Sequence, residues 1–180
     1  MNNYLEELLG SWVQAIGTVI DAISNTPSRK LSEELQTNLS ITGNVMQATG
    51  NALLADSDNT LDFEKIGNII QSIGNLTVVS GILIMSDEKR ETELEIKGNL
   101  LQTLGNLLSP FDISVDDKSS YKENLLLDVG SILQAIGNSL QAMAGILKLQ
   151  GKEQGNLNLV GGWIQASGAV LQALVQSKNS

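Results

Sequence analysis

The chain has 180 residues and a formal net charge of -9, from 11 basic and 20 acidic residues, and it contains neither Cys nor His. Without Cys there can be no disulfide or thiolate metal site, and without His the usual general base and commonest transition-metal ligand are missing. The acidic balance, with no basic patch, argues against nucleic acids and anionic membrane surfaces as partners. Aromatic residues make up only 3% of the chain, so an aliphatic core is expected.

The length suits a single domain over residues 1–180. The first seven residues, MNNYLEE, carry acidic rather than basic charge and do not resemble a secretory signal peptide. A cytoplasmic location is therefore expected, while incorporation into a spore layer and export without a signal are left open.

The first half of the chain predicts three helices, because Leu, Ile, Ala and Gln dominate and the apolar residues recur at helical spacing. The first helix begins at Asn3, which forms a capping box with Glu6, and ends before the segment Ser24 to Pro27. The other two are expected over residues 32–55 and 62–85, separated by a polar link.

The second half of the chain predicts three more helices. The fourth runs over residues 91–108 and ends before Pro110, which opens the longest irregular segment. The fifth spans residues 121–150 behind a second capping box of Ser120 and Glu123, and the sixth spans residues 156–176. Short links favour antiparallel neighbours, so the expected fold is all-α, with six antiparallel helices in a bundle or a short two-layer repeat stack.

Each predicted helix carries one copy of a motif in which Gly is followed by Gln four residues on and by a second Gly seven residues on. The copies begin at residues 10, 43, 67, 98, 130 and 161, and most intervals are close to 31 residues. Such a period is typical of stacked supersecondary units. The residues predicted to form helix–helix interfaces are Gly10, Gln14, Gly17, Gly43, Gln47, Gly50, Gly67, Gln71, Gly74, Gly98, Gln102, Gly105, Gly130, Gln134, Gly137, Gly161, Gln165 and Gly168.

The motif gives every helix two contrasting faces. The third, fourth and seventh positions are mostly apolar and form one stripe, whereas Gly, Asn or Ser, and Gln occupy the opposite side without any charge. Gly inside a helix costs about 0.5–1 kcal/mol relative to Ala, so a compensating close approach of a neighbouring helix is expected, with Gln bonding across it.

Two interpretations of these faces stay open. Either all of them are used within one six-helix domain, or some remain open and pair with other copies of the chain. In the second case, replacing Gln71, Gln102 and Gln134 by Lys should keep the fold and lower the oligomer mass.

The two Trp residues, Trp12 and Trp163, stand at the same motif position in the first and last helices. Ordinary core filling would explain them. The alternative is that the terminal helices meet and close the domain or a dimer.

No stretch predicts a phosphate loop, a catalytic triad, a metal site or a cofactor. The segment Asp56 to Asp62 resembles the start of a calcium loop but lacks its Gly and final Glu, which favours a solvated link with a helix cap. Glu93 and Glu95 stand in a charged run, where a solvated helix start is the simpler explanation than catalysis.

Two uncharged windows, residues 66–86 and 154–177, are long enough to cross a bilayer. Both contain several Asn, Gln, Ser and Thr residues, and mean hydropathy is near zero, at +0.03. Because the amides lie on one side, hairpins could insert with the amides facing a pore.

The repeated Gly-Asn-x-x-Gln-Ala-x-Gly-Asn pattern, together with Leu8, Gly10, Trp12 and the segment Ala15 to Thr18 near the start, resembles an uncharacterised family of "repetitive proteins" from Gram-positive spore-forming bacteria. The resemblance covers nearly the whole chain and implies an all-helical bacterial protein. It implies no activity and no catalytic or binding residues.

The leading hypothesis is a non-enzymatic structural or interaction protein that self-associates through its Gly/Asn/Gln faces. The alternative is a membrane-active or pore-forming protein built of helical hairpins. A small-molecule enzyme is a distant third hypothesis, which a deep pocket with convergent carboxylates would revive.

Overall fold

The computed structural model describes residues 3–28, 30–57, 61–108 and 118–178. These residues form six α-helices and no strand, which confirms the predicted all-α fold. The helices are α1 (Asn3–Ser24), α2 (Glu33–Ser57), α3 (Phe63–Ile84), α4 (Glu88–Leu108), α5 (Lys118–Leu149) and α6 (Leu157–Gln176).

The ends of the helices differ in detail from the predicted ends. Asp62 caps α3, as expected for this link, because its Oδ1 accepts a hydrogen bond of 2.8 Å from the backbone N–H of Lys65. Helix α5 begins at Lys118, so Ser120 lies inside the helix and the predicted cap there is wrong. Helix α4 begins at Glu88, three residues before its predicted start at Glu91. Most of the predicted irregular segment after Pro110 lies outside the described residues.

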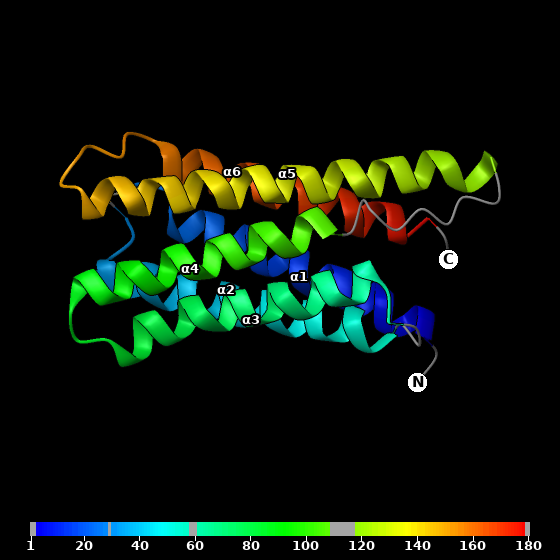
Figure 1. Ribbon diagram of the computed structural model, residues 1–180, viewed down its shortest axis with the longest axis horizontal. Helices are drawn as coiled ribbons and strands as arrows, with labels where there is room; N and C mark the ends of the chain where they lie inside the picture. The colour runs from blue at the N-terminus through cyan, green and yellow to red at the C-terminus, as the bar shows by residue number, and fades with distance from the viewer. Residues whose placement is uncertain (1–2, 29, 58–60, 109–117, 179–180) are drawn as a thin grey trace.

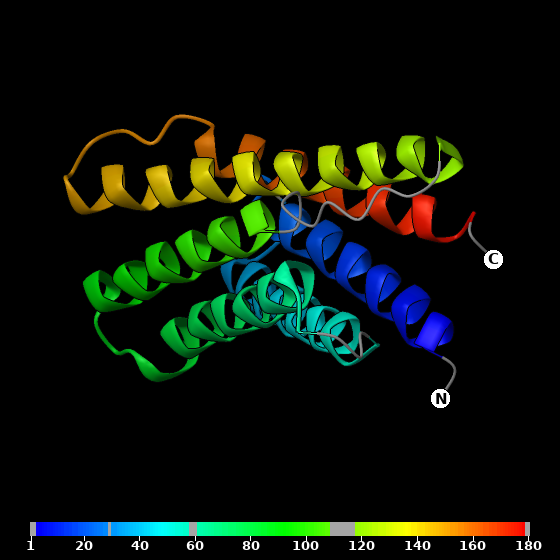
Figure 2. The ribbon, with the colours of Figure 1, turned by 45° about the vertical axis from the view of Figure 1, so that its right-hand side comes forward.

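Three antiparallel hairpins make up the bundle: α1 with α2, α3 with α4, and α5 with α6. The hairpins also touch one another through α2 and α3, α4 and α5, and α1 and α6, so the six helices close into a ring. Figures 1 and 2 show the helices lying side by side around a common axis. Both chain termini lie at one end of this axis, called here the terminal end, and the opposite end is called the distal end.

Helices α1 and α6 are in contact, as expected if the terminal helices close the domain. The indole N–H of Trp12 donates to Ser177 Oγ at 2.9 Å, and that of Trp163 donates to Thr26 Oγ1 at 3.1 Å. Trp163 is 43% exposed, so the core-filling explanation is wrong for this residue. Trp12 is half-buried and packs against the core cluster of Ala15, Ala169 and Ala173, so core filling does describe this residue. The two indole hydrogen bonds also join the first and last helical regions within one molecule.

The apolar part of the interior is aliphatic, as expected, but it consists of small side chains and shares the interior with amides. Among the described residues the buried hydrophobic side chains are all Ala or Val, and the largest fully buried side chains are Gln and Asn. The larger apolar side chains lie outside. In every motif the third position is exposed or half-buried, the fourth is half-buried, and the Gly and Gln positions are buried. The polar face of each helix therefore points toward the axis of the ring.

Candidate functional site

The glycines of the motif meet in reciprocal pairs within each hairpin. In α1 and α2 the first Gly of one helix faces the second Gly of the other, and the same arrangement recurs in the other two hairpins. The pairs are Gly10 with Gly50, Gly17 with Gly43, Gly67 with Gly105, Gly74 with Gly98, Gly130 with Gly168, and Gly137 with Gly161.

These pairs leave no room for a side chain. A Cβ atom on Gly17 would lie 2.7 Å from the carbonyl oxygen of Gly43 and 2.8 Å from the backbone nitrogen of Gln47. Both atoms belong to backbone, which cannot rotate away. The close approach brings two helices into direct backbone contact and explains why the chain tolerates Gly in the middle of every helix.

The six motif glutamines are all buried and gather in the middle of the ring. They form two groups of three. Gln14 donates to the Oε1 atoms of Gln134 and Gln71 at 3.0 and 3.4 Å. Gln165 donates in the same way to Gln47 and Gln102 at 2.9 and 3.3 Å. One group comes from α1, α3 and α5 and the other from α2, α4 and α6, so the three hairpins contribute equally.

Replacing these glutamines by Lys would therefore change the interior of the bundle and not an outer face that is open to other copies. Gln71, Gln102 and Gln134 are at most 6% exposed. A Lys at any of these positions would place a charge in the interior at high cost. Such variants would test the bundle itself rather than its association with other copies.

The amide interior extends beyond the motif in both directions. Gln141 donates to Gln165 Oε1 at 3.2 Å, and Gln172 receives a hydrogen bond from Gln134 and donates to Ser131 Oγ at 2.8 Å. Sequence reasoning missed Gln141 and Gln172, although each stands seven residues after a motif Gln. Continuing the heptad by one step would have placed both on the same inward face.

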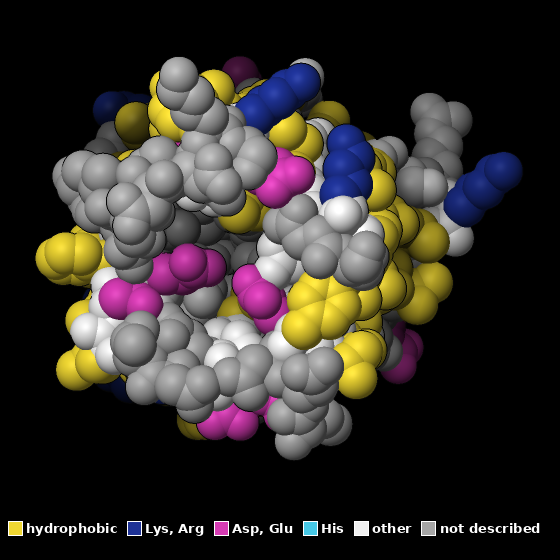
Figure 3. Space-filling view, turned by 90° about the vertical axis from the view of Figure 1, so that its right-hand side faces the viewer, with side chains coloured by type: hydrophobic (Ala, Val, Ile, Leu, Met, Phe, Trp, Pro, Cys, Tyr) yellow, Lys and Arg dark blue, Asp and Glu magenta, His cyan; other side chains and the backbone are white. Residues whose placement is uncertain are grey.

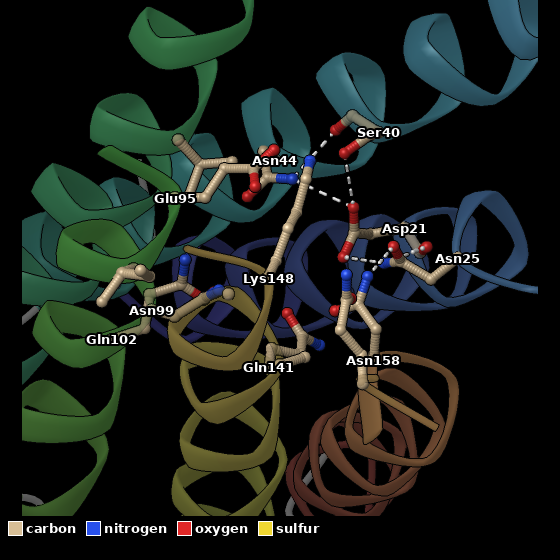
Figure 4. A pocket seen from close by; sticks show the side chains of 15 residues that line it. Asp21, Asn25, Ser40, Asn44, Glu95, Asn99, Gln102, Gln141, Lys148 and Asn158 are labelled. Carbon is tan, nitrogen blue, oxygen red and sulfur yellow. Dashed lines mark hydrogen bonds between the residues drawn. The ribbon is translucent and has the colours of Figure 1, made fainter. Parts of the chain in front are cut away.

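At the distal end the axis opens into a polar cavity of about 220 Å³. All helices of the ring contribute to its walls, and Figure 4 shows the side chains converging from different helices. The polar lining residues include Asp21, Asn25, Ser40, Asn44, Glu95, Asn99, Gln102, Gln141, Lys148 and Asn158. Gln102 and Gln141 connect the cavity to the amide interior.

Asp21 is the most buried charged residue of the cavity, at 5% exposure. Its Oδ1 accepts hydrogen bonds from Ser40 Oγ at 2.9 Å and Asn44 Nδ2 at 3.0 Å, and its Oδ2 accepts one from Asn25 at 3.3 Å. Burial raises the pKa of Asp21 to about 6, although hydrogen bonds from Ser40 and Asn44 act in the opposite direction.

Glu95 lies on α4 and is the second carboxylate of the cavity. Burial raises its pKa to about 7, opposed by the positive charge of Lys148 and reinforced by nearby carboxylates, of which Glu91 is the strongest. The prediction that Glu95 belongs to a solvated helix start is therefore wrong. Lys148 itself forms an ion pair of 3.1 Å with Glu88 at the exposed rim.

The arrangement brings amides, one Lys and two carboxylates with raised pKa values together around a cavity. Carboxylates that converge in a pocket are the feature on which the enzyme hypothesis depends. Among the described residues no three His, Cys, Asp or Glu side chains gather in a way that could hold a metal ion. The site can bind a polar or cationic group near the buried Asp21 and the half-buried Glu95, or change its charge near neutral pH.

A comparison with known proteins places the chain in a family without assigning it an activity. No curated protein and no solved structure matches it. A model of a family of unknown function, DUF6944, matches residues 5–173, which is nearly the whole chain. The protein therefore belongs to the family of unknown function DUF6944.

Proposed function

We propose that this protein is a non-enzymatic helical bundle that inserts into the hydrocarbon layer of a membrane. The observation that carries the proposal is the inversion of the bundle, with amides around the axis and large apolar side chains outside. A protein surrounded by water is stabilised by the opposite arrangement. In a bilayer, apolar side chains face lipid, and polar side chains face the bundle interior.

The exposed apolar side chains come from all six helices and are called here the outer belt. Its members between the helix ends are Leu9, Ile16, Val45, Ile69, Ile73, Leu76, Leu100, Leu104, Leu125, Val129, Ile132, Ile136, Met143, Val160, Trp163 and Leu174. The space-filling view of the terminal end shows hydrophobic side chains along the flanks, with several acidic side chains toward the middle of the face (Figure 3). Large apolar side chains exposed on every helix of the ring favour an interaction with an apolar partner.

Charge is segregated along the axis, which favours acyl chains over a second copy as the occupant of the outer belt. Helices α2, α3, α5 and α6 each contain an uncharged stretch of about 20 residues, or about 30 Å, which matches the hydrocarbon core of a bilayer. Charged residues flank these stretches at both ends of the bundle. Of the described helices, one, Phe63–Ile84, is long and apolar enough to cross a membrane by itself, which alone is weak support.

Helices α1 and α4 depart from this pattern: α1 carries Asp21, which is buried, and the first half of α4 is charged, with Lys97 exposed. A Lys side chain can lie along apolar surface with its stem while its ammonium reaches the polar layer. Helix α2 also exposes Thr42 and Thr49, which are polar but uncharged. We therefore expect the distal half of α4 to lie nearest the membrane surface.

The sequence favours self-association through the Gly/Asn/Gln faces instead. These faces already contact other helices of the same chain, so pairing between copies would require the hairpins to separate. We therefore place membrane insertion first. The predicted cytoplasmic location and the origin in Gram-positive bacteria stay predictions, and in the cytoplasm the inner membrane leaflet would be the accessible surface.

Trp163 provides the test, because it lies on the outer belt and the chain has two Trp residues. In a Trp12→Phe variant, phosphatidylcholine vesicles with brominated acyl chains should quench the fluorescence of Trp163. The matched Trp163→Phe variant, which keeps the half-buried Trp12, should be quenched less.

Charge substitutions on the outer belt supply the control. A double variant Ile69→Lys and Ile73→Lys should keep its helical circular dichroism but lose flotation with vesicles, because both side chains point outward. Thr37→Lys, exposed near the start of α2, should float as the unmodified protein does. A folded protein that stays with the soluble fraction and leaves Trp163 unquenched would refute insertion, and a stable soluble oligomer would favour self-association through the outer belt.

A further inference from the structure

We propose that the distal cavity is a binding site for a small primary ammonium ion. This inference goes beyond membrane insertion and does not rest on it, because the cavity lies inside the ring. Four features carry it: the register of the cavity with the amide interior, an amide oxygen that faces the cavity, the balance of charge, and the size of the space.

The cavity continues the glutamine layers by one heptad. Seven residues beyond the motif Gln in α1, α3 and α5, and seven before it in α2, α4 and α6, stand Asp21, Val78, Gln141, Ser40, Glu95 and Asn158. All six line the cavity. The same inward position that holds six neutral amides in the middle of the ring thus holds two carboxylates where the axis opens. The register places negative charge at the mouth of a neutral polar axis.

The buried side chains of the cavity present acceptors that the protein does not fill. Gln141 is 7% exposed and uses its amide N–H to bond Gln165. Its Oε1 accepts no hydrogen bond from the described residues, and Figure 4 shows this oxygen pointing into the cavity. This oxygen is therefore open to a ligand in the cavity that donates a hydrogen bond.

Asp21 adds a charged acceptor next to this oxygen. Ser40, Asn44 and Asn25 hold this carboxylate in place by hydrogen bonds, and the carboxylate lines the cavity. Glu95 faces the same space from α4, and an anionic ligand would meet both carboxylates at once. An ammonium group carries the charge opposite to these carboxylates and offers N–H donors to the oxygens that line the cavity.

The lining residues and the volume of the cavity indicate a ligand that is small, singly charged and organic. Two carboxylates and several amides are a poor set for calcium or magnesium, which take six or more oxygen ligands, often from several carboxylates. The volume of about 220 Å³ exceeds the need of a single ion and leaves room for a short alkyl chain, which could lie against Val78 and Ala144.

Binding should strengthen as the pH rises. The titratable and charged groups that face the carboxylates are Glu91 and Glu88 from α4 and Lys148 from α5, besides Asp21 and Glu95 themselves. Because burial raises the pKa of Asp21 to about 6 and that of Glu95 to about 7, both lose most of their protons by about pH 8. An ammonium ion then meets two full negative charges.

The experiment is a calorimetric titration of the folded full-length protein at pH 8 with propylammonium chloride at constant ionic strength. Saturable binding is expected, and it should weaken about tenfold or more in Asp21→Asn and in Glu95→Gln, as the loss of a charged hydrogen-bond acceptor implies. Glu34→Gln removes an exposed carboxylate outside the cavity and should bind as before. Circular dichroism identifies the variants that fold. If only one of the two cavity variants folds, its binding is enough for the test.

Two further titrants decide the chemistry. Tetramethylammonium has the same charge but no N–H donor, so equal binding would overturn the assignment to a primary ammonium. Competition by sodium or potassium at similar concentration would assign the site to an inorganic ion instead. The absence of saturable propylammonium binding, or equal binding to both cavity variants, would also refute the proposal. None of these results depends on whether the protein binds vesicles.

Discussion

Replacing Gly161 by Ala gives the sharpest test of backbone contact between the helices, because the neighbouring Gly162 provides a control in the same turn of α6. Both residues are buried. A Cβ atom on Gly161 would lie 2.7 Å from the carbonyl oxygen of Gly137, whereas one on Gly162 would come no closer than 3.3 Å to Ala22 Cα. Ordinary contact begins near 3.4 Å, so the first substitution forces the helices apart by about 0.7 Å and the second by about 0.1 Å.

Two opposing terms set the expected change in unfolding free energy. Ala is about 1 kcal/mol better than Gly in a helix interior, and overpacking against rigid neighbours costs about 1–3 kcal/mol. For Gly161→Ala the crowded oxygen belongs to backbone, so we expect the upper part of that cost and a net loss of about 1–2 kcal/mol. For Gly162→Ala the helix term dominates, and stability should stay unchanged or rise by up to about 1 kcal/mol.

Thermal unfolding followed by far-ultraviolet circular dichroism measures the difference. In a chain of this size about 1 kcal/mol shifts the Tm by about 2–4 °C, so Gly161→Ala should melt several degrees below Gly162→Ala. If Gly161→Ala were as stable as Gly162→Ala or more so, the hairpins would not be held in backbone contact. The explanation of the repeated glycines would then be refuted.

Two other predictions follow from the interior. Lowering the pH should stabilise the protein, because the folded-state pKa values of about 6 for Asp21 and about 7 for Glu95 lie above the ordinary values of 3.8 and 4.5. This stabilisation is complete below about pH 4 and is lost as the pH rises through 6 to 7. Urea unfolding at a series of pH values should show this change in the free energy of unfolding. The Asp21→Asn variant should show a smaller change between pH 4 and 6. Gln14→Leu removes the donor to two buried acceptors and should lower the free energy of unfolding by about 1–3 kcal/mol for each acceptor. Gln150→Leu, at an exposed position, should change the free energy of unfolding by less than about 0.5 kcal/mol. Equal effects of the two substitutions would contradict the buried network.

The sequence was sufficient to predict the number of helices and most of their ends, because those depend on local chemistry. The link before α3 shows this, since Asp62 acts there as a cap through its own side chain. The start of α5 shows the limit. Ser120 and Glu123 match a capping box, but the helix begins at Lys118, and a local pattern does not exclude extension by another turn.

The orientation of the helices could not be predicted from the same pattern. An apolar stripe is usually assigned to the core on the assumption that water surrounds the protein, and this assumption would place residues such as Ile69 and Ile132 inside. The structure leaves both exposed. The glycines were the better guide, because only direct helix contact offsets their cost, and Gln14 follows them into the interior as part of the same face.

The cavity was missed for a related reason. The motif was taken to end at its second Gly, although the helices and their register continue past it. Asp21 follows Gln14 by seven residues and Glu95 precedes Gln102 by seven, so both share the inward face of the glutamines. Read in isolation, an acidic residue in a charged run looks solvated, as Glu95 did. Its place on the ring axis depends on three hairpins meeting, which no single stretch of sequence contains.

The register also connects the three main features of the molecule. Glycine in every second turn brings paired helices together, and on the same face the intervening Gln reaches the axis. This leaves the apolar positions no place except the outside. One heptad further on, at the distal end, Asp21 and Glu95 replace the amide without disturbing the glycine pairs. Charge and cavity can therefore vary at the ends of the ring while the glycine contacts hold its middle, and a ligand site at the mouth is compatible with a lipid-facing exterior.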